Sequence, residues 1–412
     1  MSEHLHWYKG NLHMHSFWSD GVGFPEVIAG WFKDQGYHFI AFTEHDRLQD
    51  GPCWISTDPG SEPGSTIHRD GLLKQYLRSF GEDWVQRRTG DHGEEVRIRP
   101  LEEYRERFEE PGRFLIMTGE EISTTWGAAT PDEKHWINAY NLEAAIPPPP
   151  PGPDSRGAIA TVVEIGAASA GRSKRPVLVS VNHPNFSWNA TAEDLAAVES
   201  LRFMEMHTAL NSCECAGDAL HCSVERIWDI VLTLRLTEPG GAPIFGMATD
   251  DCHGYGAGHP VLGAAALPGR AWVMIRAGTL SATDLIDALE HGDFYCSSGV
   301  TLRNVERDGD GLRVEIDPVP GLRYRTRFIG TRRGYDPERR PVVDADGRTV
   351  RTTASYSDEV GSVFAETDDL APTYRFEGDE LYVRAVVTSD EDHHNPSWPG
   401  QKTQAWTQPA MP

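Results

Sequence analysis

The segment GNLHMHSFWSDG at residues 10–21 holds two histidines, His13 and His15, and then the carboxylate of Asp20. In an extended segment side chains alternate between faces, so the two imidazoles point the same way and Met14 points to the other side. Two neutral imidazoles on one face can chelate a metal ion. An isolated HxH also occurs among surface and core histidines, so a metal site requires further ligands elsewhere in the chain.

Further candidate ligands follow a series of apolar segments. HFIAFTEHD, RFLIMTGEEIS, HWINAYNL, PVLVSVNHP, LRFMEMH and APIFGMATDDCH are each typical of a buried strand that ends in polar residues. Together with the first segment they supply nine candidate ligands: His13, His15, Asp20, His45, Glu121, His135, His183, Asp251 and His253. Imidazoles and carboxylates without thiolates favour borderline-hard first-row metals. The pattern predicts a polynuclear metal site.

The elements that must position these ligands alternate between strand and helix. PEVIAGWFKDQG, ATAEDLAAVES and CSVERIWDIVLTLRL have apolar residues at helical spacing, and Thr191 followed by Asp194 resembles an N-terminal cap. This alternation predicts an α/β fold with a parallel sheet, closed as a β/α barrel. In such barrels functional groups gather at the C-terminal ends of the strands, where the candidate ligands fall.

Two domains are expected. Residues 1–298 form the barrel, interrupted by an insertion at about 47–112 that is rich in glycine, proline and charge and contains a short helical piece near PLEEYRERF. The run PPPPPGP at 147–153 predicts an extended surface loop. Residues 299–412 contain short alternating segments such as LRVEID and LYVRAVVTS, which predict a smaller, sandwich-like β domain.

Composition limits the partners. The 412 residues carry 62 acidic and 38 basic side chains, a formal charge of −24, which disfavours nucleic acid and anionic membrane surfaces. The N-terminus lacks a basic region before an apolar core, and no apolar run approaches the roughly 18 residues that span a bilayer. Six cysteines in this length show no disulfide framework. We expect a cytoplasmic protein with a small-molecule partner; oligomeric state has no readable signature.

The order of these motifs resembles one known family. HxH with SDG after it, then EHD, GEE, HxxN, NHP and DxH, over about residues 8–300, resembles the polymerase and histidinol phosphatase (PHP) family of metal-dependent phosphoesterases. GNLHMHSFWSDG, GEEIS followed by HWINAYN, and ALEHGDFYCSSG before a C-terminal β region look closest to the carbaryl-hydrolase-like branch.

The resemblance implies a distorted seven-stranded barrel that holds two or three divalent ions, commonly zinc, manganese or iron. It implies a first ion on His13, His15, Glu121 and Asp251, a second on Glu121, His135 and His183, and a third on Asp20, His45 and His253. Glu120 and Asp250 leave a register alternative. Glu121 is preferred because Ile122 and Ser123 follow it as in the family, and Asp251 because the DxH spacing requires it.

The expected chemistry is hydrolysis. Adjacent metals lower the pKa of a shared water and stabilise charge on substrate oxygens, and Asp251, or a His-Asp pair that includes it, would accept the proton. His207, at the end of RFMEMHT, could protonate a leaving group or could be structural. The leading function is a phosphoesterase for a small, anionic phosphate mono- or diester. A carboxyl-ester, carbamate or amide hydrolase with the same metals is the alternative, and a non-enzymatic metal-binding scaffold ranks third.

Overall fold

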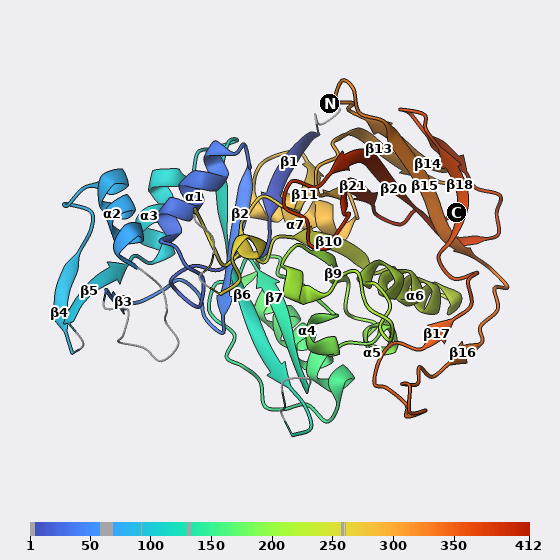
Figure 1. The fold of residues 1–412 in the computed structure, drawn as a ribbon, viewed down its shortest axis with the longest axis horizontal. Helices are drawn as coiled ribbons and strands as arrows, with labels where there is room; N and C mark the ends of the chain where they lie inside the picture. Colours follow the sequence, from blue (N-terminus) through green and yellow to red (C-terminus); the bar gives the residue numbers. More distant parts are fainter. Residues whose placement is uncertain are drawn as a thin grey trace.

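The computed structural model describes residues 5–57, 69–91, 93–128, 130, 133–256, 259 and 261–412. Its main feature is a 13-stranded mixed sheet with helices packed along it (Figure 1). The strand order is β10-β9-β8-β7-β6-β2-β1-β11-β12-β21-β20-β15-β18. The strands nearest the N-terminus therefore lie in the middle of the sheet, between the later α/β strands and the C-terminal strands.

The expected strands all form. They are β1 (His6–Asn11), β2 (Phe39–His45), β6 (Leu115–Thr125), β7 (Lys134–Tyr140), β8 (Leu178–Val181), β9 (Phe203–Thr208) and β10 (Phe245–Thr249). The pairs β1–β2, β2–β6, β8–β9 and β9–β10 are parallel, as expected. The expectation of a wholly parallel sheet is wrong at β7, which is antiparallel to both β6 and β8. The connection from β6 to β7 is too short for a crossover, so the chain must return antiparallel.

A closed barrel is not seen. Within the described residues, β10 pairs only with β9, and the second neighbour of β1 is β11 (Trp272–Ala277), which leads the sheet toward the C-terminal strands. The segments that follow β1 and β10 do meet, through isolated parallel bridges of Met14 with Cys252 and of Val22 with Gly254. The paired sheet is therefore open, although the polar ends of β1 and β10 are side by side.

The three expected helices form with the predicted signals. They are α1 (Pro25–Asp34), α5 (Ala192–Ala197) and α6 (Val224–Thr237), and α4 (Ser155–Ser173) and α7 (Ala282–Glu290) join them. Proline stands at the first position of α1, where its missing N–H costs nothing. The Thr191 hydroxyl accepts the Asp194 N–H at 3.1 Å, which confirms the predicted cap of α5. Within the described residues the short 3₁₀ turns include η2 (Phe186–Trp188), η3 (Asn211–Cys213) and η4 (Ala264–Ala266). No helix in the described ranges is long and apolar enough to cross a membrane.

The insertion expected at about 47–112 has its own secondary structure. It contains β3 (Cys53–Ser56), α2 (Arg69–Phe80), β4 (Arg87–Gly90), β5 (Gly93–Ile98) and α3 (Leu101–Phe108), with α3 at the predicted PLEEYRERF piece. The order β3-β5-β4 makes a separate three-stranded sheet. The helices α2 and α3 lie beside α1 in Figure 1. The proline run at 147–153 contains neither helix nor strand, as predicted.

The C-terminal region is rich in strands, as predicted. Its elements are β12 (Phe294–Ser297), β13 (Leu302–Asp308), β14 (Gly311–Ile316), β15 (Tyr324–Arg332), β16 (Arg339–Arg340), β17 (Ser355–Tyr356), β18 (Ser362–Thr367), β19 (Thr373–Arg375), β20 (Glu380–Asp392) and β21 (Lys402–Thr407). The strands β13, β14 and β19 form a small second sheet, whereas β21, β20, β15 and β18 extend the main sheet through β12. A domain boundary at residue 298 stays a prediction.

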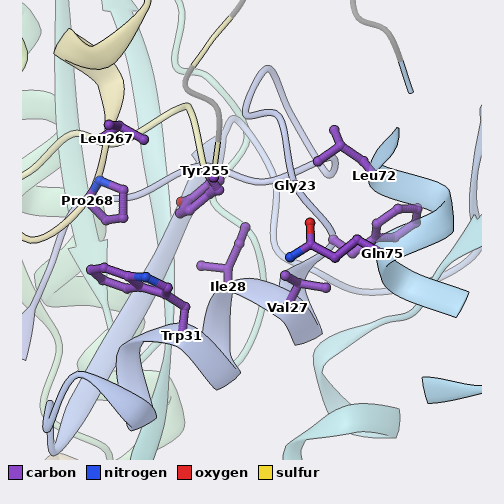
Figure 2. A pocket seen from close by; sticks show the side chains of 11 residues that line it. Gly23, Val27, Ile28, Trp31, Leu72, Gln75, Tyr255, Leu267 and Pro268 are labelled. Atoms are coloured by element: carbon purple, nitrogen blue, oxygen red, sulfur yellow. The ribbon is translucent and has the colours of Figure 1, made fainter. Parts of the chain in front are cut away.

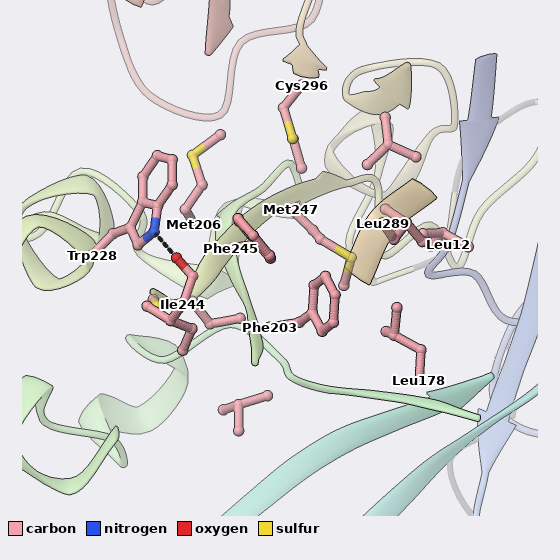
Figure 3. Close-up of a cluster of buried hydrophobic side chains, with 14 of the residues drawn as sticks. Leu12, Leu178, Phe203, Met206, Trp228, Ile244, Phe245, Met247, Leu289 and Cys296 are labelled. Carbon is pink, nitrogen blue, oxygen red and sulfur yellow. Dashed lines mark hydrogen bonds between the residues drawn. The ribbon is translucent and has the colours of Figure 1, made fainter. Parts of the chain in front are cut away.

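The largest core lies between the main sheet and the helices α4, α5, α6 and α7. Figure 3 shows side chains from β8, β9, β10, α6 and α7 meeting there, among them Phe203, Trp228 and Leu289. The indole N–H of Trp228 donates to the Ile244 carbonyl at 2.9 Å, so burying the ring leaves no donor without a partner.

A buried ion pair fixes α6 against the C-terminal strands. The guanidinium of Arg384 on β20 donates to both carboxylate oxygens of Asp229 on α6, at 2.8 and 2.7 Å. The Tyr382 hydroxyl donates to the same carboxylate at 2.8 Å. Both ionic side chains are buried, and Asp229 is the nearer of two carboxylates for Arg384, since Glu225 Oε2 lies 3.4 Å from the same guanidinium.

Candidate metal centre

Eight of the nine predicted ligands come together at the ends of the central strands. They form what we call the His-carboxylate cluster: His13, His15, Asp20, His45, Glu121, His183, Asp251 and His253. The parallel register of β2 and β6 places His45 directly opposite Glu121. Backbone hydrogen bonds from Asp251 N–H to the His13 carbonyl and from His15 N–H to the Cys252 carbonyl align the first and last ligand segments.

The alternation expected of the HxH segment is observed. His13 and His15 both face the cluster, and their ring centroids are 5.3 Å apart. Met14, between them, is fully buried in a separate apolar group with Ile40 and Cys252. The backbone is thus extended here, with the chelating pair on one side and a core residue on the other.

The inner part of the cluster brings imidazole nitrogens close to carboxylate oxygens. His13 Nε2 lies 3.3 Å from Glu121 Oε1 and 3.2 Å from Asp251 Oδ1. His15 Nε2 lies 3.4 Å from Glu121 Oε2 and 3.3 Å from Asp251 Oδ1. His183 Nε2 adds a contact of 3.4 Å to Glu121 Oε1.

The tautomer of His13 determines which of its ring nitrogens can act as a metal donor. Its Nδ1 lies 2.7 Å from Glu205 Oε1, and this contact between a ring nitrogen and a carboxylate assigns the proton to Nδ1. In the neutral ring Nε2 then carries a lone pair and is directed at two carboxylates. His13 Nε2 and His15 Nε2 are buried and have no hydrogen-bond partner in the described part of the chain. A ring nitrogen with a lone pair and a carboxylate repel each other unless a proton or a metal ion lies between them.

The outer part of the cluster surrounds Asp20. His45 Nε2 is 3.4 Å from one oxygen of this carboxylate, and His253 Nε2 is 3.4 Å from the other. The ring of His15 stacks on both of these imidazoles, with centroids 4.6 and 4.2 Å away. The side chain of Asp20 is 56% exposed and that of His45 is 30% exposed. The cluster therefore reaches solvent on this side.

The carboxylates shift the pKa values of the cluster strongly. Burial alone would lower the pKa of His13, but Asp251, Glu205 and Glu121 raise it well above its ordinary value. Burial also lowers the pKa values of His45 and His253, but nearby carboxylates outweigh it and raise them to about 11 and about 9. Burial would raise the pKa of Glu121 and Asp251, yet the histidines hold both well below their usual range. The cluster therefore attracts positive charge, whether protons or a metal.

The residues present fit divalent metal ions. Three groups each place their ligand atoms within 4.8 Å of one another: His15, Asp20, His45 and His253; His13, His183 and Asp251; and His13, His15 and Glu121. The donors are imidazole nitrogens and carboxylate oxygens, which suit borderline first-row metals. The buried nitrogens without partners are the donor atoms that such ions would use.

Glu205 belongs to this centre and was missed in the sequence. Besides the contact with His13, its carboxylate accepts the hydroxyls of Thr249 at 2.8 Å and Thr208 at 2.7 Å and the N–H of His183 at 3.0 Å. The side chain is fully buried. The available signal was an acidic residue inside the apolar strand LRFMEMH, because a buried charge requires partners.

The structure also resolves the two register alternatives. Glu120 faces away from the cluster and accepts the Ile146 N–H at 2.7 Å. Asp250 accepts backbone N–H groups of Gly269, Arg270 and Ala271. Glu121 and Asp251, the preferred members of each pair, are the ones in the cluster.

His135 is not brought into the cluster. Because β7 is antiparallel to β6, Asn138 lies opposite Glu121, and His135 lies opposite Thr124, three residues farther along β6. The His135 ring stacks on Trp126 with centroids 4.3 Å apart, and its Nε2 lies 2.9 Å from the Ser155 hydroxyl. Burial, with smaller effects of Arg351 and His183, lowers its pKa to about 3. The sequence placed this residue after a strand, whereas it lies near the start of one.

His207 also lies apart from the cluster. A bulge in β9 opposite Met247 and Ala248 shifts the register just before His207 and re-aims the following side chain. The ring packs against Trp406 and Trp398, with centroids 5.3 and 5.6 Å away. Burial lowers its pKa to about 3, aided by Arg270 and His393. These contacts resemble those of a core residue.

Comparisons with known proteins give weak likenesses. No family model and no curated protein matches the chain. A two-domain protein from Bacteroides vulgatus, described as containing a predicted PHP-like metal-dependent phosphoesterase, aligns with a TM-score of 0.37 and 13% identity over 98% of this chain and 95% of its own. A putative metal-dependent phosphoesterase from Bifidobacterium adolescentis aligns with a TM-score of 0.32 and 12% identity over 61% of this chain and 89% of its own. Scores this low leave family and function to be argued from the site.

Proposed function

We propose that the protein is a metal-dependent hydrolase of the PHP family that cleaves a small phosphate mono- or diester. The observation that carries this proposal is the cluster itself, in which buried imidazole nitrogens lie 3.2–3.4 Å from carboxylate oxygens. The motif order along the sequence supports the family assignment. Two or three divalent ions, zinc, manganese or iron, are the proposed cofactors.

The proposed chemistry divides between the ions and the chain. When bound, such ions lower the pKa of a water molecule and stabilise negative charge on the substrate oxygens. Glu205 holds the proton of His13 on Nδ1, so Nε2 stays available as a donor to the ion. The substrate approaches from the side of Asp20, which is the exposed edge of the cluster. Asp251, whose Oδ1 lies among the donor nitrogens, would help to hold an ion, and this carboxylate is the proposed proton acceptor for hydrolysis.

A second candidate function is the hydrolysis of a carboxyl ester, carbamate or amide at the same centre. One observation favours it: among the described residues, no lysine or arginine forms an ion pair with a carboxylate of the cluster. A phosphate dianion commonly binds to such cations, whereas a carbonyl ester is neutral. Both transition states present an oxyanion, so the metal centre would serve either reaction.

The test offers four substrates to the metal-loaded protein in parallel: bis(p-nitrophenyl) phosphate, p-nitrophenyl phosphate, p-nitrophenyl acetate and a p-nitrophenyl carbamate. Cleavage of a phosphate ester that is lost in His183→Ala and retained in His135→Ala supports the first proposal. Both variants remove a buried imidazole, but only His183 is a member of the cluster, whereas His135 stacks on Trp126. Cleavage of the carbon esters alone would favour the second candidate. Metal binding without turnover of any substrate would leave the non-enzymatic scaffold.

A further inference from the structure

Glu44 is a buried carboxylate one residue before the candidate ligand His45. Side chains alternate between the two faces of a strand, so β2 turns His45 toward the His-carboxylate cluster and Glu44 toward the opposite side. The Glu44 side chain is fully buried. A charged group away from water needs hydrogen-bond donors around it, so its partners show which part of the chain it holds in place.

Three of its donors belong to the turn of residues 16–19, which connects His15 to Asp20. The Ser16 N–H donates to Glu44 Oε2 at 3.1 Å, and the hydroxyls of Ser16 and Ser19 donate to the two carboxylate oxygens. The Ser19 N–H donates to the Ser16 carbonyl at 3.1 Å and closes the turn. Glu44 therefore holds both ends of this turn, each of which adjoins a candidate ligand.

A further donor comes from the insertion. Gln49 Nε2 donates to Glu44 Oε1 at 2.7 Å and to the Ser16 hydroxyl at 3.2 Å. The Tyr104 hydroxyl of α3 donates to the amide oxygen of Gln49, which fixes the orientation of that amide. The insertion thus supports the same turn that Glu44 holds.

Tyr255 anchors the backbone on either side of the turn. Its hydroxyl donates to the His15 carbonyl at 2.8 Å. Figure 2 shows Tyr255 near Gly23 in the lining of a small pocket, and a Cβ atom at Gly23 would lie 2.9 Å from the tyrosine ring. These contacts fix the chain before and after the turn. The position of Asp20 between them is then set by the turn that Glu44 holds.

We propose that Glu44 is a positioning residue for the outer part of the cluster. By holding the turn of residues 16–19, it places the Asp20 carboxylate between His45 and His253, whose Nε2 atoms each lie 3.4 Å from one of its oxygens. The side chain of Asp20 is 56% exposed, so packing alone does not fix it there. Partners that hydrogen-bond behind a metal site orient its ligands. This inference rests on the proposed metal-dependent function and assigns Glu44 to the ion that Asp20 would hold.

The test compares metal binding in wild-type protein, Asp20→Asn, Glu44→Gln and the double variant. Calorimetric titration of chelator-treated protein with zinc gives the affinity of each ion, and circular dichroism shows whether each variant is folded. Asp20→Asn removes the outer carboxylate and so identifies the ion that depends on it. We expect Glu44→Gln to weaken the same ion by about 10- to 100-fold.

The other ions should lose less than about threefold in affinity in Glu44→Gln. The Ser19 oxygen, 3.3 Å from His15 Nδ1, can still accept the proton of that ring, and Tyr255 still holds the His15 backbone. The double variant should bind the outer ion no more weakly than Asp20→Asn alone, because Glu44 acts through Asp20. A residue that only stabilises the fold would give losses that add.

Several results would overturn the proposal. They are an equal loss for every ion, additive losses in the double variant, and wild-type affinity for all ions in folded Glu44→Gln. Unchanged binding in Asp20→Asn would also overturn it, because Asp20 would then hold no ion. A wild-type protein that binds no divalent metal would refute the proposed function itself, and this inference with it.

A second variant keeps the test decisive if Glu44→Gln does not fold. Ser19→Ala removes a single donor from a half-buried position and should weaken the ion that depends on Asp20, whereas Ser19→Thr keeps the hydroxyl and should restore it. Wild-type affinity for that ion in Ser19→Ala would overturn the proposal. Glu26→Gln, which changes a buried carboxylate bonded to Tyr76 and Trp84, is the matched control and should bind every ion as the wild type does.

Discussion

Replacing Glu205 by glutamine tests how the metal centre is held in place. The carboxylate accepts four hydrogen bonds, from His13 Nδ1, Thr249 Oγ1, Thr208 Oγ1 and His183 N. Glutamine keeps the size of the side chain but replaces one accepting oxygen with an NH₂ group. Whichever oxygen is replaced, two of the four donors lose their acceptor. At about 1.5–3 kcal/mol for each hydrogen bond to a charged group, the fold loses roughly 3–6 kcal/mol of stability.

The effect on metal binding is separate from this loss. Without the carboxylate, the His13 ring loses the partner that fixes its tautomer and raises the basicity of Nε2. Loss of such a partner typically lowers metal affinity by about 10- to 100-fold, which corresponds to about 1.4–2.7 kcal/mol. His183 should contribute as well, because its backbone N–H depends on the same carboxylate. We expect the upper half of this range.

The assay is calorimetric titration of chelator-treated protein with zinc or manganese, after circular dichroism shows that the variant is folded. Glu26→Gln is the matched control, because Glu26 is also a buried carboxylate but bonds to Tyr76 and Trp84 and not to an imidazole. A folded Glu205→Gln protein with wild-type metal affinity would refute the reasoning. So would an equal loss in Glu26→Gln, since the effect would then come from general destabilisation.

Three further outcomes follow from the same geometry. His183→Ala should weaken metal binding by more than the roughly 10- to 100-fold loss expected when a residue that only hydrogen-bonds to a ligand is removed. His135→Ala should leave the metal affinity within about twofold of wild type in the same titration. Equal losses of affinity in the two variants would contradict the assigned positions. In metal-free protein, neighbouring carboxylates overcome burial and raise the pKa of His253 to about 9. Its stabilising charge is complete below about pH 6.5 and is lost as the pH rises to 9, so the urea midpoint should fall and metal affinity should rise over that window. A flat profile in both measurements would disprove this. Asp229→Ala should lower the free energy of unfolding in urea by about 3–5 kcal/mol, because it removes the closest partner of the buried Arg384 charge. The double variant Asp229→Leu with Arg384→Met should lose less stability. An equal loss in both variants would show that packing dominates.

Much of the fold could be predicted from local patterns. Apolar runs identified the strands of the α/β region, helical spacing identified α1, α5 and α6, and the cap at Thr191 marked the start of α5. The directions of the strands could not be predicted, because the period of a side-chain pattern is the same in parallel and antiparallel pairs. The alternation of strands and helices predicted a closed barrel, whereas the pairing of β1 with β11 shows an open sheet.

The same distinction holds at the candidate centre. The sequence by itself determined which side chains can donate to a metal, and it placed His13 and His15 on one face, because alternation is a local property of extended backbone. Only the tertiary structure decided that His135 lies outside the cluster, that Glu205 lies within it and that His207 packs against tryptophans. Those positions depend on the direction of β7, on a bulge in β9 and on neighbours more than a hundred residues away, and no local pattern records them.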